Sequence, residues 1–119
     1  MSTRLEVSLG LWQDRPADEV VATSLFADRF GYRAIWIGEM ATWDAFALGV
    51  HIGAQLTQAS LVLGPFAVAV RDPMMIAMGS ASVAALTGRP VAVALGTSSP
   101  VVVEKWHGRD RSRSALALA

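Results

Sequence analysis

The stretch LVLGPFAVAVRDPMMIA, residues 61–77, decides the fold. Its near-continuous apolar run, which starts at about residue 60 and ends at 70, is typical of a strand covered on both faces. Asp72 and Pro73 follow, and these residue types favour a helix N-cap and a first helical turn. A buried strand that passes through a short polar break into a helix is one βα unit of a parallel sheet.

The same order of strand and helix repeats on both sides of this unit. Strands are predicted over the ranges 5–12, 34–39, 60–70 and 90–96. Helices are predicted to begin near Pro16, Asp44 and Asp72, and glycines 31 and 88 suit the ends of the first and third helices. This repeat predicts an α/β fold built from parallel βαβ units with right-handed crossovers.

Each predicted helix has an apolar face. The first helix is expected to bury Ala22, Leu25, Phe26 and Phe30. The second has the clearest period, with a stripe of Ala45, Leu48, Gly49, Ile52, Gly53 and Leu56. The third is expected to bury Met74, Ala77, Met78, Ala81 and Ala85. The two glycines of the second stripe cost about 1 kcal/mol each relative to alanine, so we expect them to allow close approach to a strand.

The composition of the chain is typical of a single globular domain. The chain has 119 residues, of which 53% are hydrophobic, and this length suits one domain with a packed core. Ten basic residues balance ten acidic ones, which favours neither nucleic acid nor an anionic membrane as a partner. There is no cysteine, no pattern of a secretory signal and no apolar run of membrane-spanning length, so we expect a soluble cytoplasmic protein.

Four segments together resemble a known family. They are GYRAIWIGEMATWDAFAL (31–48), LVLGPFAVAVRDPMMIA (61–77), TGRPVAVALGTSSP (87–100) and EKWHGRD (104–110). In this order and spacing they resemble the amino-terminal half of the bacterial luciferase-like monooxygenase superfamily, in particular the oxidoreductases that use coenzyme F420. The resemblance implies the first half of a TIM (β/α)8 barrel, with about four βα units in residues 1–119.

The last residues of the sequence also favour half a barrel. SALALA, residues 114–119, begins a helical apolar pattern that has no cap, so we expect a truncated barrel. A complete small open-sheet domain is the alternative architecture. The sequence therefore leaves open whether the chain by itself is an active enzyme.

The resemblance also implies an activity and a coenzyme. It implies hydride transfer between F420 and a small organic substrate, with FMN and oxygen as the close variant. Members of the family often have a non-proline cis peptide in a bulge behind the coenzyme ring, at the end of the third strand. The matching residues are 64–67, and we expect that bond between Phe66 and Ala67, which makes both of them coenzyme-binding candidates.

Polar residues at the strand ends are further candidates. Glu39 ends the second predicted strand and Trp43 follows it, so both are expected to bind the coenzyme. Some F420 relatives have a histidine directly after the acidic position, where this chain has Met40, so that histidine's role does not transfer. The alternative is that Glu39 and Thr42 cap the second helix while Trp43 packs in the core.

The fourth predicted strand is followed by Thr97, Ser98 and Ser99, whose hydroxyls could hydrogen-bond the polar edge of a coenzyme ring. Their alternative role is a turn that caps a helix beginning at Pro100. Trp12 ends the first predicted strand and His107 lies in the loop after the fourth, and both are expected to face the substrate, although either could simply be structural. No cluster of His, Asp and Glu has the spacing of metal ligands, so we expect no metal site.

A second class of function is non-catalytic. Half a barrel would expose two parallel edges and an apolar inner face, which favour association. The chain would then be an inert fragment, or an assembly module that forms a homo-oligomer or pairs with a complementing barrel half.

Overall fold

A computed structural model describes residues 4–10 and 15–118 of the chain. Strands and helices alternate as β1 (Glu6–Ser8), α1 (Ala17–Arg29), β2 (Ala34–Ile37), α2 (Ala45–Gly53), β3 (Ser60–Ala67), α3 (Pro73–Thr87) and β4 (Val91–Gly96). A π-helical segment η1 (Val101–Trp106) and a short helix α4 (Ser114–Ala117) follow. The four strands form one parallel sheet in the order β1-β2-β3-β4. Parallel βαβ repeats were predicted, and that prediction is confirmed.

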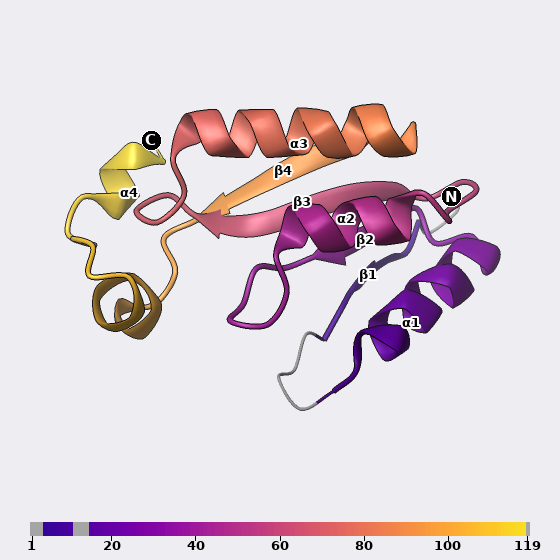
Figure 1. Ribbon diagram of the computed structural model, residues 1–119, viewed down its shortest axis with the longest axis horizontal. Coiled ribbons are helices and arrows are strands. Elements are labelled where there is room, and N and C mark those ends of the chain that lie inside the picture. Colours follow the sequence, from indigo (N-terminus) through magenta and orange to yellow (C-terminus); the bar gives the residue numbers. More distant parts are fainter. Residues whose placement is uncertain (1–3, 11–14, 119) are drawn as a thin grey trace.

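The sheet places the ends of its strands at one edge. Because all four strands run in the same direction, their carboxyl ends and the loops that follow them lie together. Figure 1 shows β3 and β4 pointing to the side where η1 and α4 lie. The described part of β1 is shorter than the predicted strand 5–12, and residues 11 and 12 of that prediction lie outside the described residues.

The core lies between the sheet and the helices α1–α3. Ile35, Ile37, Leu61 and Leu63 alternate along β2 and β3 and are buried with residues of these helices. Trp36 and Val62, at intervening positions, are only partly buried. The cover on both faces that was expected for β3 is therefore wrong. No residue of β4 is fully buried, and within the described sheet β4 pairs only with β3.

Helix α2 confirms the stripe predicted from its period. All six stripe residues, from Ala45 to Leu56, are buried. A Cβ built on Gly53 would lie 2.8 Å from side-chain carbons of both Leu61 and Thr87. This contact is too close for a real Cβ, so the predicted approach of a helical glycine to a strand is confirmed at β3. Asp44 caps the helix by accepting from the amides of Phe46 and Ala47 at 3.0 and 2.9 Å.

The predicted face of α3 is wrong, and that of α1 is wrong except at Leu25, which is partly buried and packs against the core. Ala22, Phe26 and Phe30 are exposed, and the buried residues of α1 are Val20, Ser24, Ala27 and Asp28. Asp28 fixes this rotation because its carboxylate binds the loop before β3. All five residues predicted to face the core from α3 are exposed, whereas Val83 is buried.

The rotation of α3 follows from Gly79. A Cβ on this residue would lie 2.5 Å from the ring of Phe46, so the helix turns its glycine, and not its methionines, toward α2. The ends of α3 match their predictions. Asp72 caps it through the Met74 amide at 2.8 Å, Pro73 is its first residue, and Gly88 ends it in the left-handed region with φ +66°.

Strand β3 contains a bulge between Leu63 and Phe66. The pairing Leu63↔Val93 is followed by Phe66↔Leu95, so β3 contains one more residue than β4 in this interval. Gly64 has φ +113°, and a Cβ there would lie 2.3 Å from the Ala94 carbonyl oxygen. The cis peptide was expected at Phe66–Ala67, which is wrong, because the bond in the cis form is Gly64–Pro65. Proline is the residue that tolerates this form.

Candidate functional site

A cavity of about 670 Å³ opens at the carboxyl edge of the sheet. Three loops line it. The first is 39–44, between β2 and α2; the second is the end of β3 with the turn to Arg71; the third runs from Ser98 through η1 to His107. In open parallel sheets this edge is where ligands bind, and the volume suits a small organic ligand.

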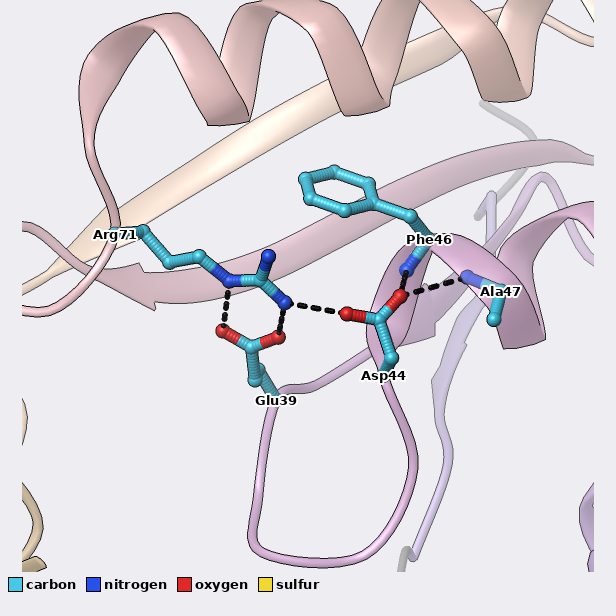
Figure 2. Close-up of polar contacts among 5 residues, drawn as sticks. All are labelled: Glu39, Asp44, Phe46, Ala47 and Arg71. Carbon is cyan, nitrogen blue, oxygen red and sulfur yellow. Dashed lines mark hydrogen bonds and ion pairs between the residues drawn. The ribbon is translucent and has the colours of Figure 1, made fainter.

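A network of three charged side chains forms one wall of the cavity. Arg71 donates from Nε to Glu39 Oε2 at 2.9 Å, and its terminal nitrogen contacts Glu39 Oε1 and Asp44 Oδ2, the latter at 2.6 Å. Figure 2 shows the guanidinium between the two carboxylates. Its central carbon also lies 4.9 Å from the centroid of the Phe46 ring. The network therefore joins the loops that follow β2 and β3.

Two of the three charges in this network, those of Arg71 and Asp44, are favoured by their partners. Hydrogen bonding to Glu39 raises the pKa of Arg71 above its usual range, although burial opposes this. Burial would raise the pKa of Asp44, but hydrogen bonds from the Ala47 amide and Arg71 hold it below its usual range. Arg71 and Asp44 are therefore both charged at neutral pH.

Thr42 contributes an unpaired hydroxyl to the same wall. It lies in the loop after β2, and its Oγ1 is buried without a hydrogen-bond partner among the described residues. Two exposed indoles, of Trp43 and Trp106, also line the cavity, from the first and third loops. The cavity thus combines aromatic and aliphatic surface with a small number of polar groups, as binding sites for organic ligands do.

The structure brings five of the nine predicted site residues together at this cavity. These are Glu39, Trp43, Ala67, Ser98 and His107. Phe66 does not line it; its side chain is fully buried and its ring lies 4.9 Å from that of Phe46. Thr97 lines a second cavity of about 330 Å³, together with Arg111 and Ser114.

Ser99 takes the role of a cap. Its hydroxyl accepts from the Val102 amide at 3.3 Å and its carbonyl accepts from Val103, which is the helix-capping alternative considered for these serines. The alternative caps suggested for α2 are not used, because Asp44 caps it and Glu39 pairs with Arg71. Trp12 lies outside the described residues.

Sequence reasoning missed Arg71 and the position of Thr42's hydroxyl. Arg71 stands in the Arg-Asp-Pro opening of α3, and that motif was noted for its helix cap and as part of the resemblance, with no role given to the arginine. An arginine directly after an apolar strand in a parallel sheet was the available signal, because a cation at this edge meets carboxylates that follow neighbouring strands. Nothing in the local sequence marks a threonine whose hydroxyl will lack a partner.

Known proteins resemble this chain in sequence and in fold. No family model matches the chain. A protein of Mycobacterium tuberculosis named "Putative coenzyme F420-dependent oxidoreductase" is 26% identical over 106 residues, which are 89% of this chain and 30% of that protein. The predicted resemblance is confirmed. The chain is similar to luciferase-like oxidoreductases of the F420-dependent type.

A solved structure supports the fold. The oxygenating constituent of 3,6-diketocamphane monooxygenase from Pseudomonas putida, a type II Baeyer-Villiger monooxygenase in complex with FMN, matches with a TM-score of 0.68. The match covers 91% of this chain and 32% of that chain, at 16% identity. The α/β architecture is that of the amino-terminal part of a luciferase-like TIM barrel. The chain spans about a third of the length of these relatives.

No helix in the described ranges is both long and apolar enough to cross a membrane. The described residues also contain no group of three His, Asp or Glu side chains placed to hold a metal ion.

Proposed function

We propose that this chain supplies the ring-binding part of a coenzyme site, in an oxidoreductase that transfers a hydride between coenzyme F420 and a small organic substrate. The observation behind the proposal is the cavity where the loops after β2, β3 and β4 meet. Similarity to an F420-dependent oxidoreductase favours the deazaflavin. FMN, used with oxygen, is the close variant, because a structural relative was solved with FMN.

The residues of the cavity fit a flat tricyclic ring. Such a ring has apolar faces and a polar edge. Pro65, Val70 and Val102 offer apolar surface, and Ala67 is small enough to leave room for a close approach. The unpaired hydroxyl of Thr42 and the hydroxyl of Ser98 supply hydrogen-bonding groups for the polar edge.

The cavity suits the phosphate group of the coenzyme less well than it suits the ring. Among its described lining residues, Arg71 is the only lysine or arginine, and it is already bound to two carboxylates. We therefore assign the ring, and not the phosphate, to this cavity.

The protein's own contribution to the reaction is positioning and exclusion of water. The coenzyme, when bound, supplies the hydride chemistry. Arg71 holds Glu39 and Asp44 together and so fixes the loops after β2 and β3 against each other. Trp43 and Trp106 add large apolar surface from the first and third loops, which would shield the reacting face from water.

Direct titration tests the proposal. Riboflavin, FMN and F420 are titrated against the purified chain, and binding is followed by ligand fluorescence. We expect Thr42→Val to weaken coenzyme binding about fivefold, because one hydrogen bond contributes about 1 kcal/mol. The same variant should unfold at a higher temperature without ligand, because it buries a methyl group in place of an unpaired hydroxyl.

The matched control is Thr23→Val, which replaces an exposed threonine of α1 whose hydroxyl donates to the Glu19 carbonyl at 2.8 Å. We expect this variant to bind the coenzymes as the parent chain does. Absence of binding by all three compounds would contradict the proposed function. An unchanged affinity in Thr42→Val would remove that residue from the site.

A second candidate is an assembly module, in which the chain pairs with itself or with a complementing barrel half. The exposed edge strand favours it: Val93 and Leu95 of β4 are exposed, and β4 has a strand partner only on its β3 side within the described sheet. We expect sedimentation velocity to show a dimer that Val93→Lys dissociates. A monomer at every concentration tested would reject this candidate.

A further inference from the structure

The charged groups of the cavity are unevenly matched. Apart from His107, the described lining residues with ionisable side chains are Glu39, Asp44 and Arg71. Two carboxylates face one guanidinium, so the wall has a formal charge of one negative unit. The amino terminus of α2 offsets roughly half a charge at Asp44. A negative balance remains among the described lining residues, and the nearby Arg111, which does not line the cavity, donates to the Ser98 carbonyl at 2.9 Å.

The negative side chains of the network are together more exposed to a ligand in the cavity than the positive side chain of Arg71. The side chain of Asp44 is 47% exposed, whereas those of Arg71 and Glu39 are each 20% exposed. The guanidinium of Arg71 is also bound on one side by both carboxylates and lies over the Phe46 ring (Figure 2). The most accessible charge is therefore the carboxylate of Asp44.

The uncharged part of the lining favours flat or apolar groups. Met40, Trp43 and Trp106 are all exposed around the cavity. Indole rings stack on flat apolar groups and attract cations through their faces. The aromatic surface and the negative balance thus favour the same kinds of molecule.

We infer that the organic substrate of this site is an uncharged or cationic molecule with a flat apolar portion, and that the site disfavours anionic molecules. The inference rests on the proposed function, in that this cavity is where the substrate meets the coenzyme. It adds the charge class of the substrate, which the proposed function leaves open.

Equilibrium dialysis with matched probes tests the inference. The probes are menadione, the same naphthoquinone ring with a sulfonate, and the same ring with a trimethylammonium group, each with and without riboflavin. We expect the sulfonate to bind at least about fivefold more weakly than menadione at low salt, and the difference to shrink at high salt because salt screens charges. The trimethylammonium probe should bind at least as tightly as menadione.

Two variants locate the effect. Asp44→Asn removes the charge and keeps the α2 cap, because the amide oxygen can accept from Phe46 and Ala47, while the NH2 group replaces the oxygen that accepts from Arg71. We expect it to tighten sulfonate binding about threefold and to change menadione binding much less. The control is Asp72→Asn, the same change at the N-cap of α3, which does not line the cavity.

Three results would overturn the inference. They are equal binding of menadione and its sulfonate, no binding of menadione or the cationic probe, and an equal effect of the two variants. Failure of the coenzyme titration with charge discrimination intact would instead reject the proposed function, so the two failures are distinguishable.

Discussion

Replacing Asp28 with asparagine should reduce the acid sensitivity of this fold. Asp28 is only 2% exposed, at the end of α1. Its carboxylate accepts from the amides of Thr57, Gln58 and Ala59 at 2.8, 3.0 and 2.7 Å, and from the Thr57 hydroxyl at 2.7 Å. Burial opposes ionisation, but these bonds prevail and lower its pKa from 3.8 to about 2.

The magnitude follows from linkage between protonation and folding. At about 1.36 kcal/mol per pKa unit, a pKa lowered from 3.8 to about 2 stabilises the fold by about 2 kcal/mol. Because the folded state has the lower pKa, this stabilisation is complete above about pH 5. It is lost as the pH falls through 3.8 toward about 2.

Urea unfolding at a series of pH values between neutral and acid measures this. We expect Asp28→Asn to cost about 2 to 4 kcal/mol at neutral pH, because an amide NH2 replaces one acceptor among buried donors. Its stability should also fall less steeply with acid than that of the parent chain. The control is Asp18→Asn, an exposed position in the first turn of α1. Parallel acid profiles for the parent and Asp28→Asn would refute the assignment of the pKa to this carboxylate.

Three other expectations follow from the same structure. Arg71→Gln leaves Glu39 beside a second carboxylate without a counter-charge, and we expect a loss of about 2 kcal/mol in the free energy of unfolding. The double variant with Glu39→Gln should recover part of it in a double-mutant cycle. Gly64→Ala should lower the melting temperature far more than Gly31→Ala. Both have positive φ, but only at Gly64 does a Cβ meet backbone, at 2.3 Å. Gly79→Ala should cost about 1 to 3 kcal/mol by thermal unfolding, because its Cβ would overlap a phenylalanine ring.

The sequence predicted the order of elements well because that order is set locally. Caps such as Asp44 and Asp72, and the glycine at 88, mark helix ends through bonds to residues a few positions away. The face of α2 was predictable for a similar reason. Its apolar residues form one stripe, so a single rotation of the helix buries them all.

The faces of α1 and α3 were not predictable from periodicity because both helices have apolar residues on more than one side. Long-range contacts choose the buried side. In α1 the choice is made by Asp28, through a loop about 30 residues away, and in α3 by Gly79 against the ring of Phe46. Phe26 and the methionines of α3 are exposed because the contacts of Asp28 and Gly79 set the rotation of each helix.

The position of the candidate site in the sheet was predictable from the sequence, but the identity of its residues was predictable only in part. Parallel strands end at one edge, so Glu39, Ala67 and Ser98 were expected to lie near each other, and they do. Phe66 moved out of the set because the bulge at 64–65 turns its side chain into the core. The position of Arg71 after an apolar strand was a signal in the sequence, but its two carboxylate partners became evident only in the structure.

The bonds made by Arg71 also have a consequence for how this edge of the sheet tolerates changes in length. Residues 39–44 and the turn at 68–71 are tied across the gap between two strands, so an insertion in either one would pull the other out of place. The stretch 107–110 is exposed and lies outside that tie. Extra residues should be accommodated there, which makes it the natural point for grafting a tag or for diversifying the mouth of the cavity.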